Sequence, residues 1–190
     1  RGKAHQAQFR YMKLKQQVNP HFLFNSLNIL DCLVCEQRTE QASAYIHKLA
    51  GIYRYMLQNE EETLVRLREE MAFVGMYVDL LQVRFPEGFR VETDIPDEAM
   101  NRHVLPCSVQ LLIENAIKHN SVGADRPLVI RIVAGAGAVT VSNNLQLKVS
   151  GTTSTRVGLN YIRQQYLDLS GIPIGIRRTD TEYCVTLPLL

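Results

Sequence analysis

Residues 17–28 read Gln-Val-Asn-Pro-His-Phe-Leu-Phe-Asn-Ser-Leu-Asn, and they place a histidine directly after a proline in a stretch with helical spacing of apolar residues. Proline lacks a backbone N–H and disturbs the turn before it, so we predict that His21 lies on an exposed face beside a local kink. A neutral imidazole near pH 7 is a competent nucleophile for phosphoryl transfer. These residues alone do not favour His21 over the other four histidines, because a lone histidine is more often an ordinary exposed or hydrogen-bonded side chain.

The first 85 residues carry helical periodicity almost throughout, and Pro20 is the only proline among them. We predict helices near residues 3–35, 40–58 and 66–84, with a break in the polar and acidic stretch 58–63. The first of these helices has more apolar positions than one partner helix can cover, namely Leu23, Leu27, Leu30 and Val34. The pattern therefore predicts a helical hairpin that packs in a homodimer.

The helical periodicity ends at residues 85–88, Phe-Pro-Glu-Gly, a combination that is typical of a turn. Alternating patterns predict strands at residues 89–95, 128–133, 138–141, 174–178 and 183–187. Helical patterns predict one helix at residues 106–119, with Pro106 in its first turn, and another at residues 157–169. Residues 143–155 are polar and are predicted to form a loop. The chain is thus expected to be α+β, with a helical domain at residues 1–85 and an α/β domain at residues 86–190.

A second informative stretch, residues 111–120, reads Leu-Leu-Ile-Glu-Asn-Ala-Ile-Lys-His-Asn. On a helix Asn115, Lys118 and His119 share one face, because they stand at positions i, i+3 and i+4. The carbonyl oxygen of an asparagine suits Mg²⁺, and a lysine offers a point charge to phosphates. Without further context such a trio is normally a solvated helix face.

The stretch at residues 17–28 closely resembles the phosphoacceptor motif of the LytS/YehU-type sensor histidine kinases, and residues 49–57 and 67–85 resemble the helical region of the same family. The resemblance implies that His21 takes the γ-phosphoryl group of ATP and that this group then passes to an aspartate of a response-regulator protein. Phe22 follows the histidine where many histidine kinases place an acid, so the group that orients His21 is not evident from its neighbour. Asn25, one helical turn later, is our candidate for a hydrogen bond to the ring, although its ordinary role would be that of a surface amide.

Residues 114–119 resemble the N-box of the GHKL nucleotide-binding superfamily, which implies a Bergerat-type α/β sandwich with a mixed, mostly antiparallel sheet. The resemblance implies ATP and Mg²⁺ as ligands, with Asn115 ligating the magnesium and Lys118 and His119 contacting phosphates. The carboxylate of Glu114, beside Asn115, is a candidate for polarising the nucleophile or holding a metal-bound water.

Two further stretches resemble nucleotide-binding motifs of the same superfamily less closely. At residues 142–145, Asn143 stands where relatives carry an aspartate that accepts a hydrogen bond from the adenine amine, and Leu145 stands at the usual glycine position. Residues 154–160 resemble the end of the ATP lid and the start of the next helix, where backbone N–H groups attract phosphate. The residues implied there are Thr155, Gly158, Leu159 and Asn160.

Two alternatives remain open. The changes at Asn143 and Leu145 also suit a catalytically impaired dimeric pseudokinase or scaffold with a degraded nucleotide site. The second alternative is an ATPase or chaperone of the GHKL superfamily, which transfers the phosphoryl group of ATP to water. Such a protein would have no use for an acceptor histidine.

Composition and charge exclude other classes of protein. The formal net charge is only +2 with no dominant basic stripe, so nucleic acid is not an expected partner. No run of 18 apolar residues spans a membrane, and no signal peptide is visible. The four cysteines are expected to be reduced thiols, as in a reducing cytoplasm. Together with the resemblance, this predicts the cytoplasmic domain of an inner-membrane sensor protein, a fragment whose upstream membrane sensor segment is absent.

Overall fold

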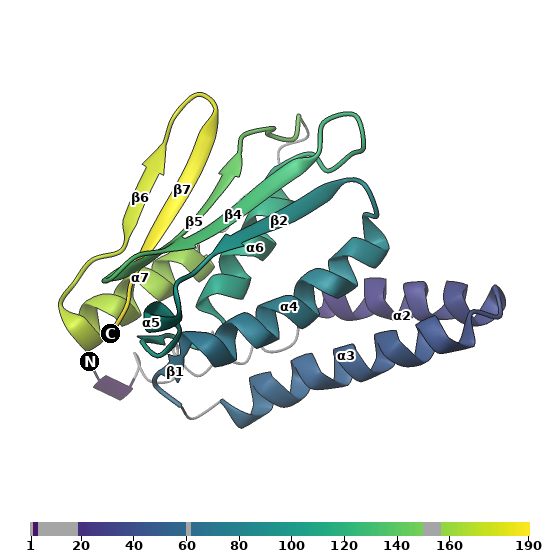
Figure 1. Cartoon of the computed structure of the whole chain (residues 1–190), viewed down its shortest axis with the longest axis horizontal. Helices are drawn as coiled ribbons and strands as arrows, with labels where there is room; N and C mark the ends of the chain where they lie inside the picture. The colour runs from purple at the N-terminus through teal and green to yellow at the C-terminus, as the bar shows by residue number, and fades with distance from the viewer. Residues whose placement is uncertain (1, 4–18, 60–61, 150–156) are drawn as a thin grey trace. The chain divides into compact units, whose positions relative to one another are not determined.

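The computed structural model describes residues 2–3, 19–59, 62–149 and 157–190 (Figure 1). The chain folds into two compact units, Arg1–Glu61 and Glu62–Leu190. Residue 1 and residues 4–18, the latter being part of the predicted helix at residues 3–35, lie outside the described residues.

The first unit is a helical hairpin of α2 (Pro20–Cys35) and α3 (Thr39–Gln58). Pro20 is the first residue of α2, where its missing N–H is not needed, and the Asn19 side chain caps the helix. Pro20 thus opens α2 and does not interrupt it, and the turn before it, where the kink is predicted, lies outside the described residues. The turn between the helices uses Gln37 at a positive φ of 58°.

The second unit is a five-stranded sheet with helices on one face. In chain order it contains β1 (Val65–Arg66), α4 (Leu67–Arg84), β2 (Phe89–Asp94), α5 (Asp97–Met100), β3 (His103–Val104), α6 (Ser108–His119), β4 (Leu128–Ala134), β5 (Ala138–Asn144), α7 (Val157–Ser170), β6 (Gly175–Arg178) and β7 (Glu182–Pro188). The strand order is β2-β4-β5-β7-β6. Only β2 and β4 pair in parallel, and the other three pairs are antiparallel.

The core of this unit lies between the sheet and helices α4, α6 and α7 (Figure 1). Alternate residues of the central strands point into it and are almost fully buried, among them Leu128, Ile130, Ile132, Val139 and Leu187. Burial of each such side chain contributes roughly 1.5–3 kcal/mol. The predicted α+β fold with a mixed, mostly antiparallel sheet is confirmed.

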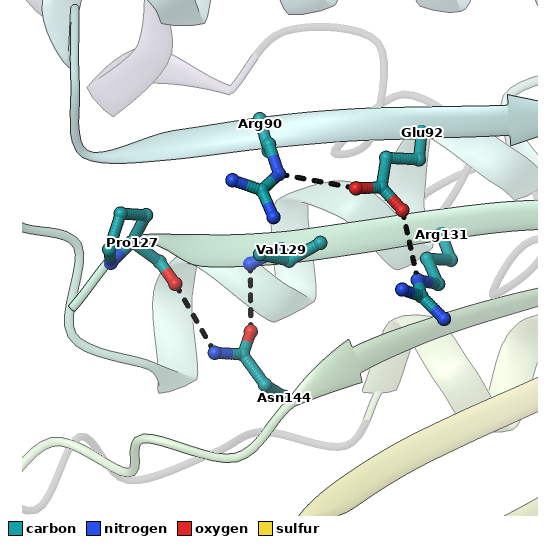
Figure 2. A network of polar contacts seen from close by, with 6 residues as sticks. All are labelled: Arg90, Glu92, Pro127, Val129, Arg131 and Asn144. Atoms are coloured by element: carbon teal, nitrogen blue, oxygen red, sulfur yellow. Dashed lines mark hydrogen bonds and ion pairs between the residues drawn. The ribbon is translucent and has the colours of Figure 1, made fainter.

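The opposite face of the sheet carries polar side chains. Glu92 accepts a hydrogen bond from Arg90 of the same strand, β2, at 3.2 Å, and one from Arg131 of the parallel neighbour β4 at 3.0 Å (Figure 2). All three side chains are well exposed to water, so these ion pairs contribute little to stability.

Within the second unit, two boundaries of predicted elements differ by two or more residues from the predicted ones. Strand β5 continues to Asn144, because the side chain of Asn144 extends the hydrogen bonding between β5 and β4. Its Oδ1 accepts from Val129 N at 2.7 Å, and its Nδ2 donates to Pro127 O at 3.2 Å (Figure 2). The prediction of a loop from residue 143 is wrong at its start. The prediction of Pro106 in the first turn of a helix is also wrong, because α6 begins at Ser108 after Cys107 at a positive φ of 63°.

Helix α4 belongs to the second compact unit, since it packs against α6 and β2. The compact units thus divide between residues 61 and 62, earlier than the predicted functional boundary between residues 85 and 86. The assignment of dimerisation and phosphotransfer to residues 1–85, and of ATP binding to residues 86–190, stays a prediction.

Candidate functional site

His21 lies in the first turn of α2, with its side chain exposed to solvent. Its backbone N–H donates to Asn19 Oδ1 at 3.1 Å, and that of Phe22 donates to the same oxygen at 3.4 Å. The cap fixes the backbone beneath the imidazole, because these N–H groups have no partner within the helix. The local sequence therefore holds the candidate acceptor on a capped helix end with its ring accessible.

The side chain of Asn25 contacts the ring of His21, as the spacing of one helical turn predicts. The amide nitrogen of Asn25 lies 3.1 Å from Nδ1 of His21. An amide N–H only donates, so Nδ1 accepts in this orientation and the neutral ring carries its proton on Nε2. If the amide is turned by half a rotation, its Oδ1 accepts a hydrogen bond from Nδ1–H, and the lone pair of the neutral ring is then on Nε2. The Asn25 amide can thus hold either tautomer of His21.

Helix α6, which carries the N-box resemblance, is anchored at its start by a residue that the sequence did not single out. Glu70 of α4 is fully buried, and its carboxylate accepts from Cys107 N at 2.8 Å, Val109 N at 3.0 Å and Gln110 N at 3.4 Å. A carboxylate is favoured at a helix N-terminus, where the peptide dipoles leave partial positive charge. Glu70 therefore fixes α6 against α4.

The Glu114 carboxylate belongs to a cluster of polar side chains, with Gln110 of α6 and Tyr77 of α4. Gln110 Nε2 donates to Glu114 Oε2 at 3.0 Å, and Gln110 also bonds to the hydroxyl of Tyr77. Burial raises the pKa of Tyr77, and the charge of Glu114 raises it further, so the phenol stays protonated. Gln110 and Tyr77 were not predicted, and they restrain the orientation of Glu114.

Asn115 is half-buried, and its side chain makes no hydrogen bond with a described residue. Its amide oxygen is thus available as a ligand, and the Glu114 carboxylate lies next to it in sequence. These residues fit a magnesium ion, which takes one or two protein oxygens and completes its shell with water and phosphate. No cluster of three or more His, Cys, Asp or Glu side chains suited to a metal occurs among the described residues, and a magnesium site of this kind does not require one.

Lys118 is exposed and His119 is half-buried at the last turn of α6. Burial lowers the pKa of His119, and the charges of Lys118 and Lys148 lower it further. The structure thus brings a third basic residue, Lys148, to the two predicted ones.

Asn143 is buried on the face of β5 that it shares with Val139 and Val141, the face that packs toward α6. Its Nδ2 donates to Asn144 O at 2.9 Å, which leaves Oδ1 as the acceptor. Leu145 does not have a positive φ, since only Gln37 and Cys107 do so among the described non-glycine residues. A leucine therefore introduces no backbone strain at this position.

The lid residues are only partly described. Thr155 lies outside the described residues, whereas Gly158, Leu159 and Asn160 form the first turn of α7. Helix α7, which begins with these residues, contacts α6 within the second unit. His21 and Asn25 belong to the first unit, and the other described candidates belong to the second.

Residues 9–89 match the family model described as histidine kinase. The sensor protein LytS of Staphylococcus haemolyticus is 29% identical over 190 residues, an alignment that covers 92% of this chain and 32% of the relative. The sensor protein LytS of Bacillus cereus is 39% identical over 106 residues, covering 56% of this chain and 18% of the relative. The chain thus contains a region of the histidine kinase family at residues 9–89, and its sequence is similar to LytS-type sensor proteins.

The chain spans a third or less of the length of those relatives. Among solved structures, the Acinetobacter baumannii histidine kinase AdeS aligns with a TM-score of 0.46 at 13% identity, over 89% of this chain and 96% of that one. Within the described part of the chain, no helix is both long and apolar enough to cross a membrane.

Proposed function

We propose that this chain is the catalytic portion of a two-component sensor kinase, which phosphorylates itself on His21 with ATP and passes the group to an aspartate of a response regulator. The observation that carries the proposal is the exposed His21 ring held at Nδ1 by Asn25. With Oδ1 of Asn25 accepting from Nδ1–H, Nε2 attacks the γ-phosphorus. The bond to the bridging oxygen breaks, and ADP leaves with that electron pair.

In this proposal residues 106–160 bind the nucleotide. Asn115 would hold Mg²⁺, with Glu114 next to it, and the ion would neutralise charge on the phosphates when bound. Lys118 and His119 would contact the phosphates, and Gly158, Leu159, Asn160 and the undescribed Thr155 would contribute from the lid side. Catalysis would rest on positioning and charge stabilisation, as is general for phosphoryl transfer.

The proposal is tested by incubating the protein with Mg²⁺ and ATP radiolabelled on the γ-phosphate. We expect a label that is lost in acid and kept in alkali, as phosphohistidine is. A protein that binds ATP but takes no label would instead be the impaired scaffold. No structural observation favours that alternative, because Leu145 causes no strain and Asn143 keeps a free acceptor oxygen.

We also propose that the chain acts in the cytoplasm as part of a membrane sensor. The described cysteines, Cys32, Cys35, Cys107 and Cys184, are all free thiols, which suits a reducing compartment.

The exposed apolar residues of the first unit support a homodimer. On α2, Phe24, Leu27 and Val34 are 67%, 50% and 63% exposed, while on α3 Ile46 and Leu57 are 50% and 64% exposed. Their separations within each helix, of 3, 7 and 11 residues, are close to whole numbers of helical turns, so they lie along one face of each helix. Covering such side chains contributes roughly 1.5–3 kcal/mol each. We expect a dimer in sedimentation at high micromolar concentration and a shift to monomer for Leu27→Glu. A wild-type chain that stays monomeric there would contradict the prediction.

Replacing Asn143 by aspartate is expected to tighten ATP binding about fivefold to tenfold. A hydrogen bond to a charged acceptor contributes roughly 1 kcal/mol more than a neutral one. GTP should bind nearly as before, since guanine offers an acceptor at the edge where adenine offers its amine. The variant also loses the bond from Nδ2 to Asn144 O, so its stability should fall slightly. Calorimetry with both nucleotides tests this, and unchanged or weaker ATP binding would mean that Asn143 does not face the base.

A further inference from the structure

The segment after β5 runs back along the C-terminal end of α6. Asn120 Oδ1 accepts from Gln146 N at 2.9 Å, and Ser121 N donates to Gln146 O at 2.8 Å. Two residues later, Lys148 N donates to His119 O at 3.1 Å, and Leu147 forms a bridge with Asn120. These backbone bonds fix Lys148 next to His119, although 29 positions separate them in the sequence.

The charges at this place are unbalanced. Lys118 and Lys148 are both exposed, and neither makes an ion pair with an acidic side chain among the described residues. Burial lowers the pKa of His119 most, and the charges of Lys118 and Lys148 lower it further. The negative end of the α6 dipole favours Lys118 and His119, because they belong to the last turn of that helix. Lys148 is not part of α6, so the helix dipole does not account for its position beside Lys118. Two positive charges that lie close together repel each other, and an anion bound by both would relieve this repulsion.

We propose that Lys148 binds the polyphosphate of ATP together with Lys118 and His119. This inference rests on the proposed function and adds a residue to it. A lysine suits this role because its ammonium group acts as a mobile point charge toward phosphate oxygens. The contact is to the phosphates and not to the base, since the predicted adenine contact, Asn143, lies five residues earlier on β5.

The test measures binding by calorimetry with Mg-ATP and with adenosine, which has the same base and ribose without phosphates. For Lys148→Gln we expect roughly tenfold weaker binding of Mg-ATP and unchanged binding of adenosine. Lys148→Arg keeps the charge and should restore most of the affinity. The matched control is Arg178→Gln on edge strand β6, which removes the same charge from an exposed position and should bind both ligands like the wild type. The difference between wild type and Lys148→Gln should shrink as salt is added, because salt screens exposed charges.

Equal binding of Mg-ATP by wild type and Lys148→Gln would overturn the inference and leave the proposed function standing. A parallel loss of adenosine binding would also overturn it, since the change would then act on the segment's fold. If the wild type binds neither nucleotide nor nucleoside, the proposed function itself fails and this inference fails with it.

Discussion

Changing His21 to glutamine is expected to abolish labelling by γ-labelled ATP while leaving the affinity for Mg-ATP unchanged. Glutamine has no ring nitrogen to attack the phosphorus, so the loss should be complete and not partial. Affinity should persist because the proposed nucleotide-binding residues belong to the second unit, whereas His21 belongs to the first. Gel autoradiography measures the label, and calorimetry measures the affinity.

The matched control for this change is His47→Gln on α3. His47 is likewise exposed, and its ring bonds only locally, to Ser43. This variant should label like the wild type. Full labelling of His21→Gln, or loss of label in His47→Gln, would show that the acceptor has been assigned to the wrong residue.

Replacing Glu70 by leucine is expected to destabilise the second unit by about 3–5 kcal/mol, because two buried N–H groups and one part-buried N–H group at the start of α6 lose their charged acceptor. That is a large part of the roughly 5–15 kcal/mol that holds a typical domain folded. Glu70→Gln keeps one acceptor oxygen and should lose less. Urea denaturation followed by circular dichroism measures the change.

The neighbouring Glu69 provides the control, since it is exposed on the same helix. Glu69→Gln should stay within about 0.5 kcal/mol of the wild type, as exposed substitutions generally do. If Glu70→Leu proves as stable as Glu69→Gln, the N–H groups of α6 must find other partners, and Glu70 is not what fixes the N-box helix.

Features set by neighbouring residues could be predicted from the sequence. The ends of α3 and α4 lie within a residue of the predicted ones, because the break after residue 58 and the turn at residues 85–88 are local signals. The contact between Asn25 and His21 follows from a spacing of one helical turn. The predicted role of that contact in phosphoryl transfer stays a prediction.

Features set by distant residues could not be predicted in this way. Helix α6 starts two residues later than expected because its cap comes from Glu70, 37 positions before Cys107. Strand β5 extends into a polar stretch because Asn144 bonds to β4 through its side chain. The position of Lys148 beside His119 likewise depends on pairing across a long separation. The spacing of apolar residues along the sequence does not predict polar contacts of this kind.

The way Glu70 holds α6 has an evolutionary consequence. Its carboxylate bonds to main-chain N–H groups, which every residue except proline supplies. This contact therefore places little constraint on the side chains at positions 107 and 109, while it requires an acceptor of the right length at position 70. Selection on the contact therefore acts on position 70 alone. In homologous chains we expect an acidic residue to be retained at this position, with no correlated substitutions at positions 107 and 109.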